Sequence, residues 1–518
     1  MDDDLKYSLK RSAKGSVTLA FSQILSTILL AIGMIVVARV LGSNKWGLLS
    51  IANSIVTLVQ IFQDFGIKDT LTKYISENKH LGKTGNVKIM IESGLALSII
   101  SSFLLTSLLI LSADYIANIF YNAPELGYLI KLLSIALIGR ALLFASYGVT
   151  EGYERMELRG GLRIFYTFLK SIASPFLVLL GYGAIGGVIG EAGPILLTGI
   201  SGLIIIYLLY RKEKRTDTDI THKQALTLFL SFGGPIYLAN LITSVRPQIL
   251  TFLLGIHAGE EITGNFTVVF WFSSLISFVN LPIRTTIFPL LSKLSDKRDL
   301  KFVYRNSIKY ASLFIYPIVF TIIALSSQII EALFSTDYQY APTYLKLYMI
   351  VYLYTGIGSL SNIPLLNSQK QTRETLIIQL IQFSVTVLPS VIIIPKYGAI
   401  GALTLLITGI GVSKIYAIKR IHTIFNFYPD FTSSIKLFLS GLLISLIIWY
   451  TFSNVFFNPW IELILGGILS MLIYLGLVIS LKVLTKQDYS RIKELAPIFG
   501  PLSPYFKTVI EKISKLSN

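Results

Sequence analysis

The sequence Tyr-Gly-Ala-Ile-Gly stands at 182–186, and the same five residues return 215 positions later at 397–401. A second landmark recurs at nearly this spacing, because the Leu-Gly pair at 41–42 is matched by another at 254–255. Recurrence over so long a period indicates that the chain arose by duplication. The pentapeptide predicts one tight turn in each half, and the duplication predicts a protein in which one half moves against the other.

The composition places the chain in a membrane. Of its 518 residues 53% are hydrophobic, and the mean hydropathy is +0.68, which is more apolar surface than a soluble protein buries. A span needs about 20 apolar residues, and a helix satisfies its own backbone there. The sequence therefore predicts an all-α membrane protein with fourteen spans, at 15–40, 46–72, 89–112, 128–150, 164–181, 184–209, 226–254, 263–290, 308–330, 343–366, 375–394, 399–418, 437–456 and 461–481.

The basic residues indicate which way the chain is oriented. The net charge is +17, and with a cytoplasmic N-terminus most of the 45 Lys and Arg residues fall in segments predicted to be cytoplasmic. The predicted outer loops hold only Lys45 and Lys396. This is the positive-inside pattern, so the charge needs no nucleic acid partner to explain it. We expect a multi-pass protein of the cytoplasmic membrane with both termini in the cytoplasm.

The loop spacing predicts five parts. Residues 1–210 and 226–420 each carry six spans, so both bundles enter the membrane from the same side and surround a central cleft. A basic cytoplasmic linker at 211–225 joins them, and two further spans lie at 437–481. The tail at 482–518 mixes Lys with apolar residues, which is typical of an amphipathic segment on the cytoplasmic membrane surface.

Several basic residues lie within the predicted spans, where each charge costs about 2.5–3.5 kcal/mol on insertion scales. Four of them lie near span ends, and we interpret them as reaching toward the interface: Lys131, Lys309, Lys346 and Lys414.

Four other cations lie deeper and have no acid at a neighbouring helical position, namely Arg140, Lys170, Arg246 and Arg284. Arg39, near the end of the first span, is a further candidate. Such side chains need an external counter-ion, and Arg binds phosphate oxygens in a bidentate fork. These residues therefore predict a cationic cleft for an anionic ligand.

Acidic residues within the spans are fewer. Asp64 and Asp69 lie on the second span and are possible ion-coupling residues, although Asp64 is four residues from Lys68 and a local ion pair is expected there. Glu191 stands alone on the sixth span, so it is the best candidate to couple transport to Na⁺ or H⁺, with a structural hydrogen bond as the alternative. No other cofactor and no metal site is predicted. Gly82, with Lys and Thr after it, lacks the rest of a phosphate-binding loop, so ATP hydrolysis is not expected.

Three stretches resemble a known family. Arg-Val-Leu-Gly at 39–42, followed by Trp-Gly-Leu at 46–48, resembles the helix 1 to helix 2 junction of polysaccharide flippases in the multidrug, oligosaccharidyl-lipid and polysaccharide exporter superfamily. Residues 65–75 are similar to the end of helix 2 in that family, and the repeated pentapeptide resembles its loops before helices 6 and 12. The resemblance extends over residues 10–480 and rests on the order of these motifs within the fourteen-span frame.

The resemblance implies a transporter that moves an undecaprenyl- or dolichyl-linked oligosaccharide to the outer leaflet by alternating access. It implies a cationic central cavity and coupling to an ion gradient or the membrane potential. The implied partners are the lipid-linked glycan, membrane lipids and the glycosyltransferases or polymerase of the same pathway, and we expect a monomer. In the peptidoglycan-precursor branch, spans 13 and 14 form a groove for the lipid tail. That branch carries arginines on its first helix, whereas residues 15–38 carry no charge here, so a peptidoglycan precursor is disfavoured.

Two other functions fit the sequence less well. A cation-coupled multidrug exporter of the same superfamily would be expected to carry acidic residues in its cleft, notably on the first helix, which has none. A membrane glycosyltransferase or polymerase usually needs a large polar loop with catalytic residues. The longest predicted loop, at 418–437, has Asp430 as its only acid.

Overall fold

The computed structural model describes residues 3–213, 218–274, 276, 287–453, 458–485 and 488–490. Helices are the only regular structure in these ranges, so the predicted all-α class is confirmed. The described residues form two compact units, each treated by itself. The first comprises Met1–Ser274, Asp337–Tyr340 and Thr386–Leu405, and the second comprises Leu275–Thr336, Ala341–Val385 and Leu406–Asn518. The five predicted parts stay predictions.

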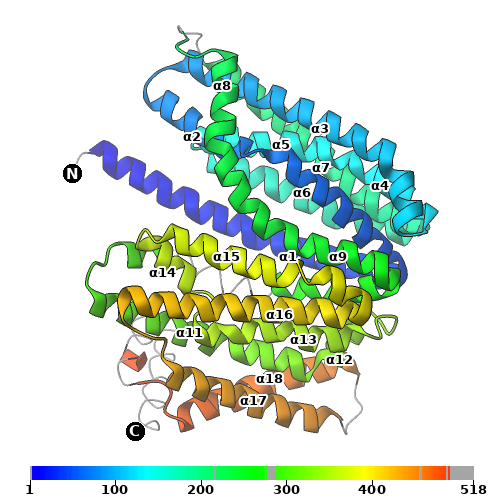
Figure 1. Ribbon diagram of the computed structural model, residues 1–518, viewed down its shortest axis with the longest axis vertical. Helices are drawn as coiled ribbons and strands as arrows, with labels where there is room; N and C mark the ends of the chain where they lie inside the picture. Colours follow the sequence, from blue (N-terminus) through cyan, green and yellow to red (C-terminus); the bar gives the residue numbers. More distant parts are fainter. Residues whose placement is uncertain are drawn as a thin grey trace. The chain divides into compact units, whose positions relative to one another are not determined.

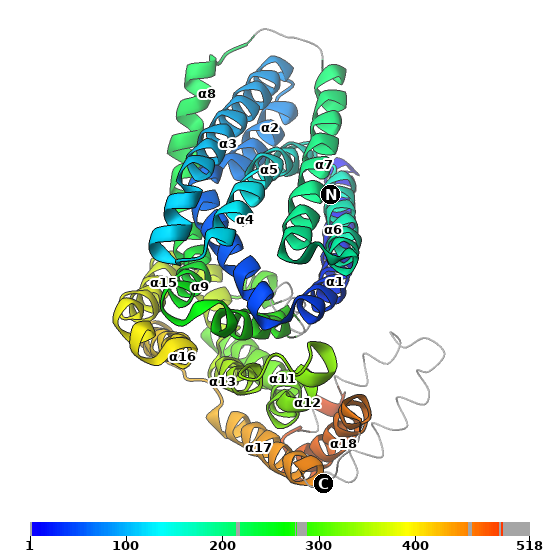
Figure 2. The ribbon, with the colours of Figure 1, turned by 90° about the vertical axis from the view of Figure 1, so that its right-hand side faces the viewer.

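The helices of the first unit follow one another closely along the chain (Figures 1 and 2). They are α1 (Asp3–Asp64), α2 (Ile67–His80), α3 (Thr84–Phe120), α4 (Pro124–Ser134), α5 (Ala136–Gly152), α6 (Met156–Leu177), the π-helix η1 (Val178–Tyr182), α7 (Gly183–Lys212), α8 (His222–Leu228), the π-helix η2 (Phe229–Gly233), α9 (Gly234–Val268) and the short η3 (Val269–Trp271).

The second unit holds most of the remaining helices. They are α11 (Lys297–Ala324), α12 (Ser326–Leu333), α13 (Ala341–Leu353), η4 (Tyr354–Ile357), α14 (Asn362–Ser368), α15 (Thr372–Val387), α16 (Ser390–Phe425), α17 (Phe431–Ser453) and α18 (Pro459–Ser480). The last residues of α15 and the first half of α16 belong to the first unit. Predicted spans 13 and 14 correspond to α17 and α18, which pack against each other and against α11.

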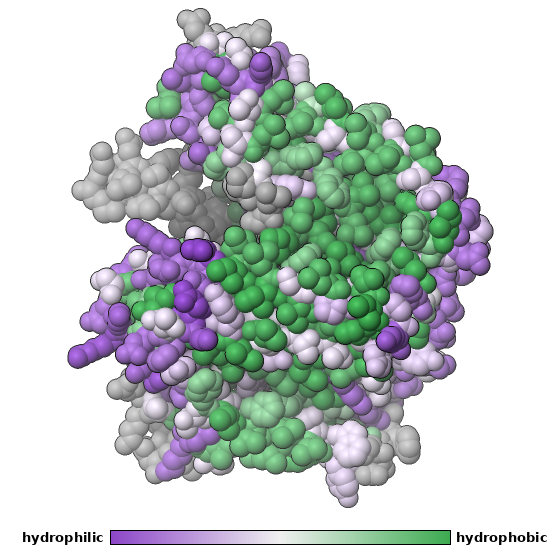
Figure 3. All heavy atoms as spheres, viewed as in Figure 1, coloured by the Kyte–Doolittle hydropathy of each residue, from purple (hydrophilic) through white to green (hydrophobic). Residues whose placement is uncertain are grey.

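The surface of the first unit suits a lipid environment. Along α3, Ile100, Leu104 and Leu111 are each more than 60% exposed, although they are strongly apolar. Figure 3 shows apolar side chains covering the middle of these helices, with polar ones gathered toward their ends. Nine helical segments of the described residues are long and apolar enough to cross a membrane, or ten if one bent pair counts as a span. The chain is therefore a multi-pass membrane protein, and the count of fourteen spans stays a prediction.

The repeat is visible in the backbone. Gly183 and Gly398, which belong to the two copies of the pentapeptide, interrupt their helices with nearly the same dihedral angles, φ 54°, ψ −138° and φ 54°, ψ −135°. The predicted tight turns are thus confirmed. A second pair of breaks lies at Gly42 (φ 70°, ψ 173°) and Gly259 (φ 79°, ψ −178°). Positive φ is strained for residues with a Cβ, which accounts for glycine at these breaks.

One pairing inferred from the sequence is corrected by these angles. The Leu-Gly repeat matches Gly42 with Gly255, but Gly255 has no positive φ, and the counterpart of Gly42 in conformation is Gly259, four residues further along. The Leu-Gly pair at 254–255 therefore repeats the residue types of the pair at 41–42 but not its backbone conformation. The offset between the halves is 217 residues at this point and 215 at the pentapeptide.

Just after these breaks, α1 and α9 cross at very short range. A Cβ added to Gly47 would lie 1.8 Å from the backbone oxygen of Glu260, and one added to Gly264 would lie 2.0 Å from that of Ser43. Both Ser43 with Glu260 and Gly47 with Gly264 are counterparts at the offset of 217. Each half therefore makes the same contact on the other, as two subunits do across a two-fold axis. We call these four residues the glycine crossing.

In the second unit, a buried ion pair corrects another prediction. Lys309 was interpreted as reaching toward the interface, but it is 6% exposed and its Nζ lies 2.5 Å from Oδ2 of Asp488, which is 2% exposed. Asp488 also accepts hydrogen bonds from Tyr310 and Thr485. This pair ties the start of the predicted tail to α11. Most of that tail, 491–518, lies outside the described residues.

Candidate functional site

Small residues bring α5, α6 and α7 close together in the first unit (Figure 2). A Cβ at Gly139 of α5 would lie 2.7 Å from the backbone of Ile195 on α7. A Cβ at Gly190 of α7 would lie 2.3 Å from Cα of Ser174 on α6. Glycine permits such close approach between membrane helices. Because Arg140 follows Gly139 and Glu191 follows Gly190, the same contacts position both charged side chains.

A charge cluster forms where these helices meet. Nη2 of Arg140 lies 3.1 Å from Oε1 of Glu191, and Nζ of Lys170 contacts Oε2 of the same carboxylate. Tyr166 donates its hydroxyl hydrogen to Oε1 over 3.0 Å. Arg140 also donates to the side-chain oxygen of Gln60 on α1. We call these five residues the Glu191 cluster.

The Glu191 cluster carries more positive than negative charge inside the protein. The side chains of Arg140, Lys170 and Glu191 are each only 12–13% exposed. Two cations face one carboxylate, which leaves one positive charge in excess. In a low-dielectric interior, such an excess favours an anionic ligand.

Two expectations about these residues were wrong. Arg140 and Lys170 were expected to lack an internal counter-ion, and Glu191 was described as an isolated carboxyl group. The structure pairs all three, because α5, α6 and α7 meet side by side. Ion pairs between helices far apart in sequence cannot be found from spacings within one helix. Whether these residues bind substrate stays a prediction.

A basic stripe on α6 leads away from the Glu191 cluster. Arg159, Arg163, Tyr166 and Lys170 follow at intervals of four, three and four residues, so they share one helical face. We call these four residues the α6 stripe.

The first member of the stripe is neutralised. Nε of Arg159 lies 2.5 Å from Oε1 of Glu151, whose other oxygen lies 3.8 Å from Nζ of Lys68.

Arg163 differs from its neighbours in the α6 stripe. It is half-buried, and within the described part of the chain it has no carboxylate partner. The sequence pattern misses this residue because the predicted fifth span begins at 164, whereas α6 begins at Met156. The regular spacing of Arg159, Arg163 and Lys170 was the signal that could have found it.

Three other predicted site residues lie outside the Glu191 cluster. Arg246 lies on α9 with its Nε buried and without a hydrogen-bond partner among the described residues. Arg39 is exposed on α1, three residues before the break at Gly42. Asp69 lies in the first turn of α2 with its Oδ1 3.4 Å from Nζ of Lys68.

Two predicted residues cannot be placed. The side chain of Asp64 and the whole of Arg284 lie outside the described residues. The predicted ion pair between Asp64 and Lys68 therefore stays a prediction. Within the described ranges, no group of three His, Asp or Glu side chains is arranged to hold a metal ion.

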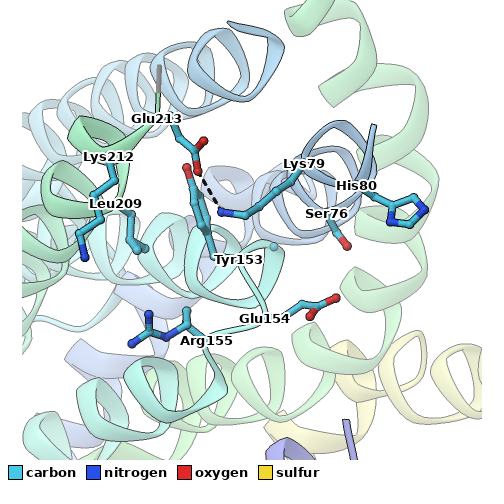
Figure 4. A pocket seen from close by; sticks show the side chains of 10 residues that line it. Ser76, Lys79, His80, Tyr153, Glu154, Arg155, Leu209, Lys212 and Glu213 are labelled. Carbon is cyan, nitrogen blue, oxygen red and sulfur yellow. Dashed lines mark hydrogen bonds and ion pairs between the residues drawn. The ribbon is translucent and has the colours of Figure 1, made fainter. Parts of the chain in front are cut away.

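A polar hollow lies at the ends of α2, α5 and α7 predicted to be cytoplasmic. This cleft of about 400 Å³ is lined by Lys79, Arg155, Lys212, Glu213 and neighbouring residues. Figure 4 shows Lys79 reaching past the ring of Tyr153 to Glu213, with Nζ 2.9 Å from the carboxylate. Arg155 likewise contacts a carboxylate, so two of the three Lys and Arg side chains that line the cleft are already paired.

The fold and the Glu191 cluster together define a multi-pass helical membrane protein with net positive charge buried among its helices. The family described as polysaccharide biosynthesis protein matches residues 12–295, which is more than half of the chain. The chain belongs to this family, which confirms the resemblance to polysaccharide flippases seen in the sequence motifs.

Individual relatives support the fold along nearly the whole chain. The probable low-salt glycan biosynthesis flippase Agl15 of Haloferax volcanii is 20% identical over 500 residues, which cover 94% of this chain and 99% of that protein. The structure of the lipid II flippase MurJ in an inward closed conformation matches with a TM-score of 0.68 at 19% identity, covering 89% of this chain and 98% of that one. An inward-facing multidrug resistance transporter of the MATE family and the MOP superfamily matches with a TM-score of 0.63 at 17% identity, covering 80% and 98%.

Proposed function

We propose that the protein is a flippase that moves a lipid-linked oligosaccharide, carried on a polyprenyl phosphate or diphosphate, across the cytoplasmic membrane for the assembly of a surface polysaccharide or glycan. It acts as a transporter by alternating access and catalyses no covalent reaction. The observation that carries the proposal is the pair of buried cations, Arg140 and Lys170, on a single carboxylate in a chain of the polysaccharide biosynthesis family.

The chemistry of the Glu191 cluster and the α6 stripe suits the head of such a substrate. A phosphate group offers several acceptor oxygens to the forked donors of Arg140 and to the ammonium group of Lys170. Arg163 and the buried Nε of Arg246 have donors that the described protein leaves unused, and a phosphate or sugar oxygen would satisfy them. Arg39 and Arg284 belong to the same proposed cationic surface.

The arrangement in the membrane is part of the proposal. Fourteen spans form two six-helix bundles around a central cleft, with α17 and α18 as the additional pair, and both termini lie in the cytoplasm. The protein acts as a monomer within the lipid bilayer, beside the glycosyltransferases or polymerase of its pathway. The positive-inside distribution of Lys and Arg supports this orientation.

An ion gradient or the membrane potential supplies the driving force. Glu191 is the favoured coupling residue for H⁺ or Na⁺, because it lies in the buried cluster. Asp69 is partly exposed beside Lys68 and takes second place. Asp64 remains a candidate from the sequence.

The alternative is a cation-coupled multidrug exporter, since the fold also matches a MATE-family transporter. A cationic drug would need carboxylates in excess of cations. The Glu191 cluster has the opposite balance, with Arg140 and Lys170 facing one acid, so the flippase is favoured.

A transport assay tests the proposal. The purified protein is placed in vesicles with a labelled polyprenyl diphosphate oligosaccharide, and a membrane-impermeant glycosidase measures how fast the glycan reaches the opposite leaflet. Arg140→Ala and Lys170→Ala should each slow transport about 10-fold or more, because a charged hydrogen bond is worth roughly 1.5–3 kcal/mol. Arg246→Ala and Arg284→Ala should also abolish or slow export.

The matched control is Lys131→Ala. Lys131 also pairs with a carboxylate, with Nζ 2.5 Å from Oδ2 of Asp114, but this pair lies on the exposed surface. Its loss should leave transport unchanged. Normal transport by folded Arg140, Lys170 and Arg246 variants would show that the cationic site does not bind the substrate.

A further inference from the structure

The Glu191 carboxylate occupies the donors that a phosphate would need. Its Oε1 accepts from Arg140 and Tyr166, and its Oε2 contacts Lys170. Both oxygens are therefore engaged by the cations that face them. An anionic head that is to bind Arg140 and Lys170 from the position between them has to take the place of this carboxylate.

The backbone of α7 is easily bent around Glu191. Gly190 precedes it, Gly193 follows two residues later with open space where a Cβ would be, and Pro194 lies inside α7. Proline lacks the N–H that would bind the carbonyl of Gly190, which weakens the helix at this turn. A small bend or rotamer change here would move Glu191 away from Arg140 and Lys170 without unfolding the helix.

We propose that Glu191 is the resident counter-ion of the cationic site, that the substrate's phosphate takes its place, and that the displaced carboxyl group takes up one proton from water. This proposal rests on the proposed function. In the empty site, Glu191 bridges Arg140 and Lys170 and neutralises one of them. In the loaded site, the phosphate oxygens accept from both cations.

The α6 stripe supplies a first contact for the exchange. Arg163 lies seven residues before Lys170 on the same face of α6 and has no carboxylate partner among the described residues. A phosphate can therefore bind Arg163 while the Glu191 cluster is still closed. It then reaches Lys170 and Arg140 by displacing Glu191.

Protonation follows from the surroundings of Glu191. The charged and titratable groups that face it in the described structure are Arg140 from α5 and Tyr166 and Lys170 from α6, while Gln60 of α1 reaches it through Arg140. Once both cations are bound to phosphate, an ionised Glu191 would be left beside like charge in an apolar interior. Both effects favour the neutral carboxylic acid.

The test measures binding of P1,P2-dimethyl diphosphate, a diester that stays doubly ionised across the neutral range. Calorimetry is run on the purified protein in lipid nanodiscs, in buffers with different ionisation heats. Glu191→Gln should bind the diester about 10-fold more tightly than the wild type at pH 7.5, because the competing charge is gone while an oxygen for Arg140 and Tyr166 remains. The wild type should take up about one proton per diester bound, and Glu191→Gln none.

Glu213→Gln is the matched control, since Glu213 pairs with Lys79 directly after the same helix and should change neither value. Unchanged or weaker binding by Glu191→Gln would overturn the proposal. If that variant does not fold, the absence of proton uptake by the wild type overturns it alone.

The proposed function has its own readout. If Arg140→Ala and Lys170→Ala bind the diester normally, both proposals fail at this site. If they lose binding while Glu191→Gln behaves as wild type, only the counter-ion proposal fails.

Discussion

Adding one methyl group at the glycine crossing should force α1 and α9 apart. In Gly264→Ala, the new Cβ would stand 2.0 Å from the Ser43 oxygen, and a Cβ does not come within 3.0 Å of such an atom. The two backbones must therefore separate by at least 1 Å at this point. Overpacking of this kind costs about 1–3 kcal/mol. Gly47→Ala should behave alike, because its Cβ would stand 1.8 Å from the Glu260 oxygen.

Thermal unfolding in detergent measures the effect, and each variant should unfold several degrees below the wild type. Gly193→Ala and Gly161→Ala provide the control, since both glycines are helical and a Cβ would meet nothing within 4 Å. Alanine is the better helix former by up to about 1 kcal/mol, so these two variants should unfold at the same temperature or higher. Equal stability of the Gly264→Ala and Gly193→Ala proteins would refute the close crossing.

Three further outcomes are expected. Lys309→Met should destabilise the second unit by about 3–5 kcal/mol, because it leaves Asp488 buried without its partner, and Asp488→Leu in the same chain should restore most of this loss in a double-mutant cycle. Burial raises the pKa of Asp488, but hydrogen bonds from Lys309, Tyr310 and Thr485 outweigh it and lower the pKa to about 2. The stability that this carboxylate contributes is therefore fully present above about pH 4 and lost as the pH falls toward 2, so unfolding temperatures should drop more steeply there for the wild type than for Asp488→Asn. Arg246→Lys should restore part of the transport lost in Arg246→Ala if its charge binds the substrate, whereas a purely structural role would leave both variants equally impaired.

Much of the fold could be predicted because it depends on local patterns. Long apolar runs specify helices in a membrane whatever their neighbours, and the glycines of the repeated pentapeptide interrupt helices where turns were expected. The counterpart of Gly42 was misassigned because a Leu-Gly pair does not specify a backbone conformation. Only the φ and ψ angles identify Gly259.

The sequence predicted the charged residues of the site but not the contacts between them. Arg140, Lys170 and Glu191 were each singled out, since a buried charge is unusual on any one helix. Their mutual contacts depend on how closely α5, α6 and α7 approach, which Gly139 and Gly190 decide and hydropathy does not record. Gln60 and Tyr166 were missed for a related reason, because uncharged polar residues gain meaning only from the charges they contact.

The glycine crossing also bears on the origin of the chain. Ser50 and Thr267, which are counterparts at the same offset of 217, lie 2.9 Å apart through their hydroxyl oxygens. Equivalent residues that meet one another mark the axis of a symmetric dimer. The crossing thus keeps, inside a single polypeptide, the interface that two identical ancestral chains would have shared. A fragment that carries α1 and a fragment that carries α9, produced as separate chains, should bind each other through this contact and reassemble in the membrane.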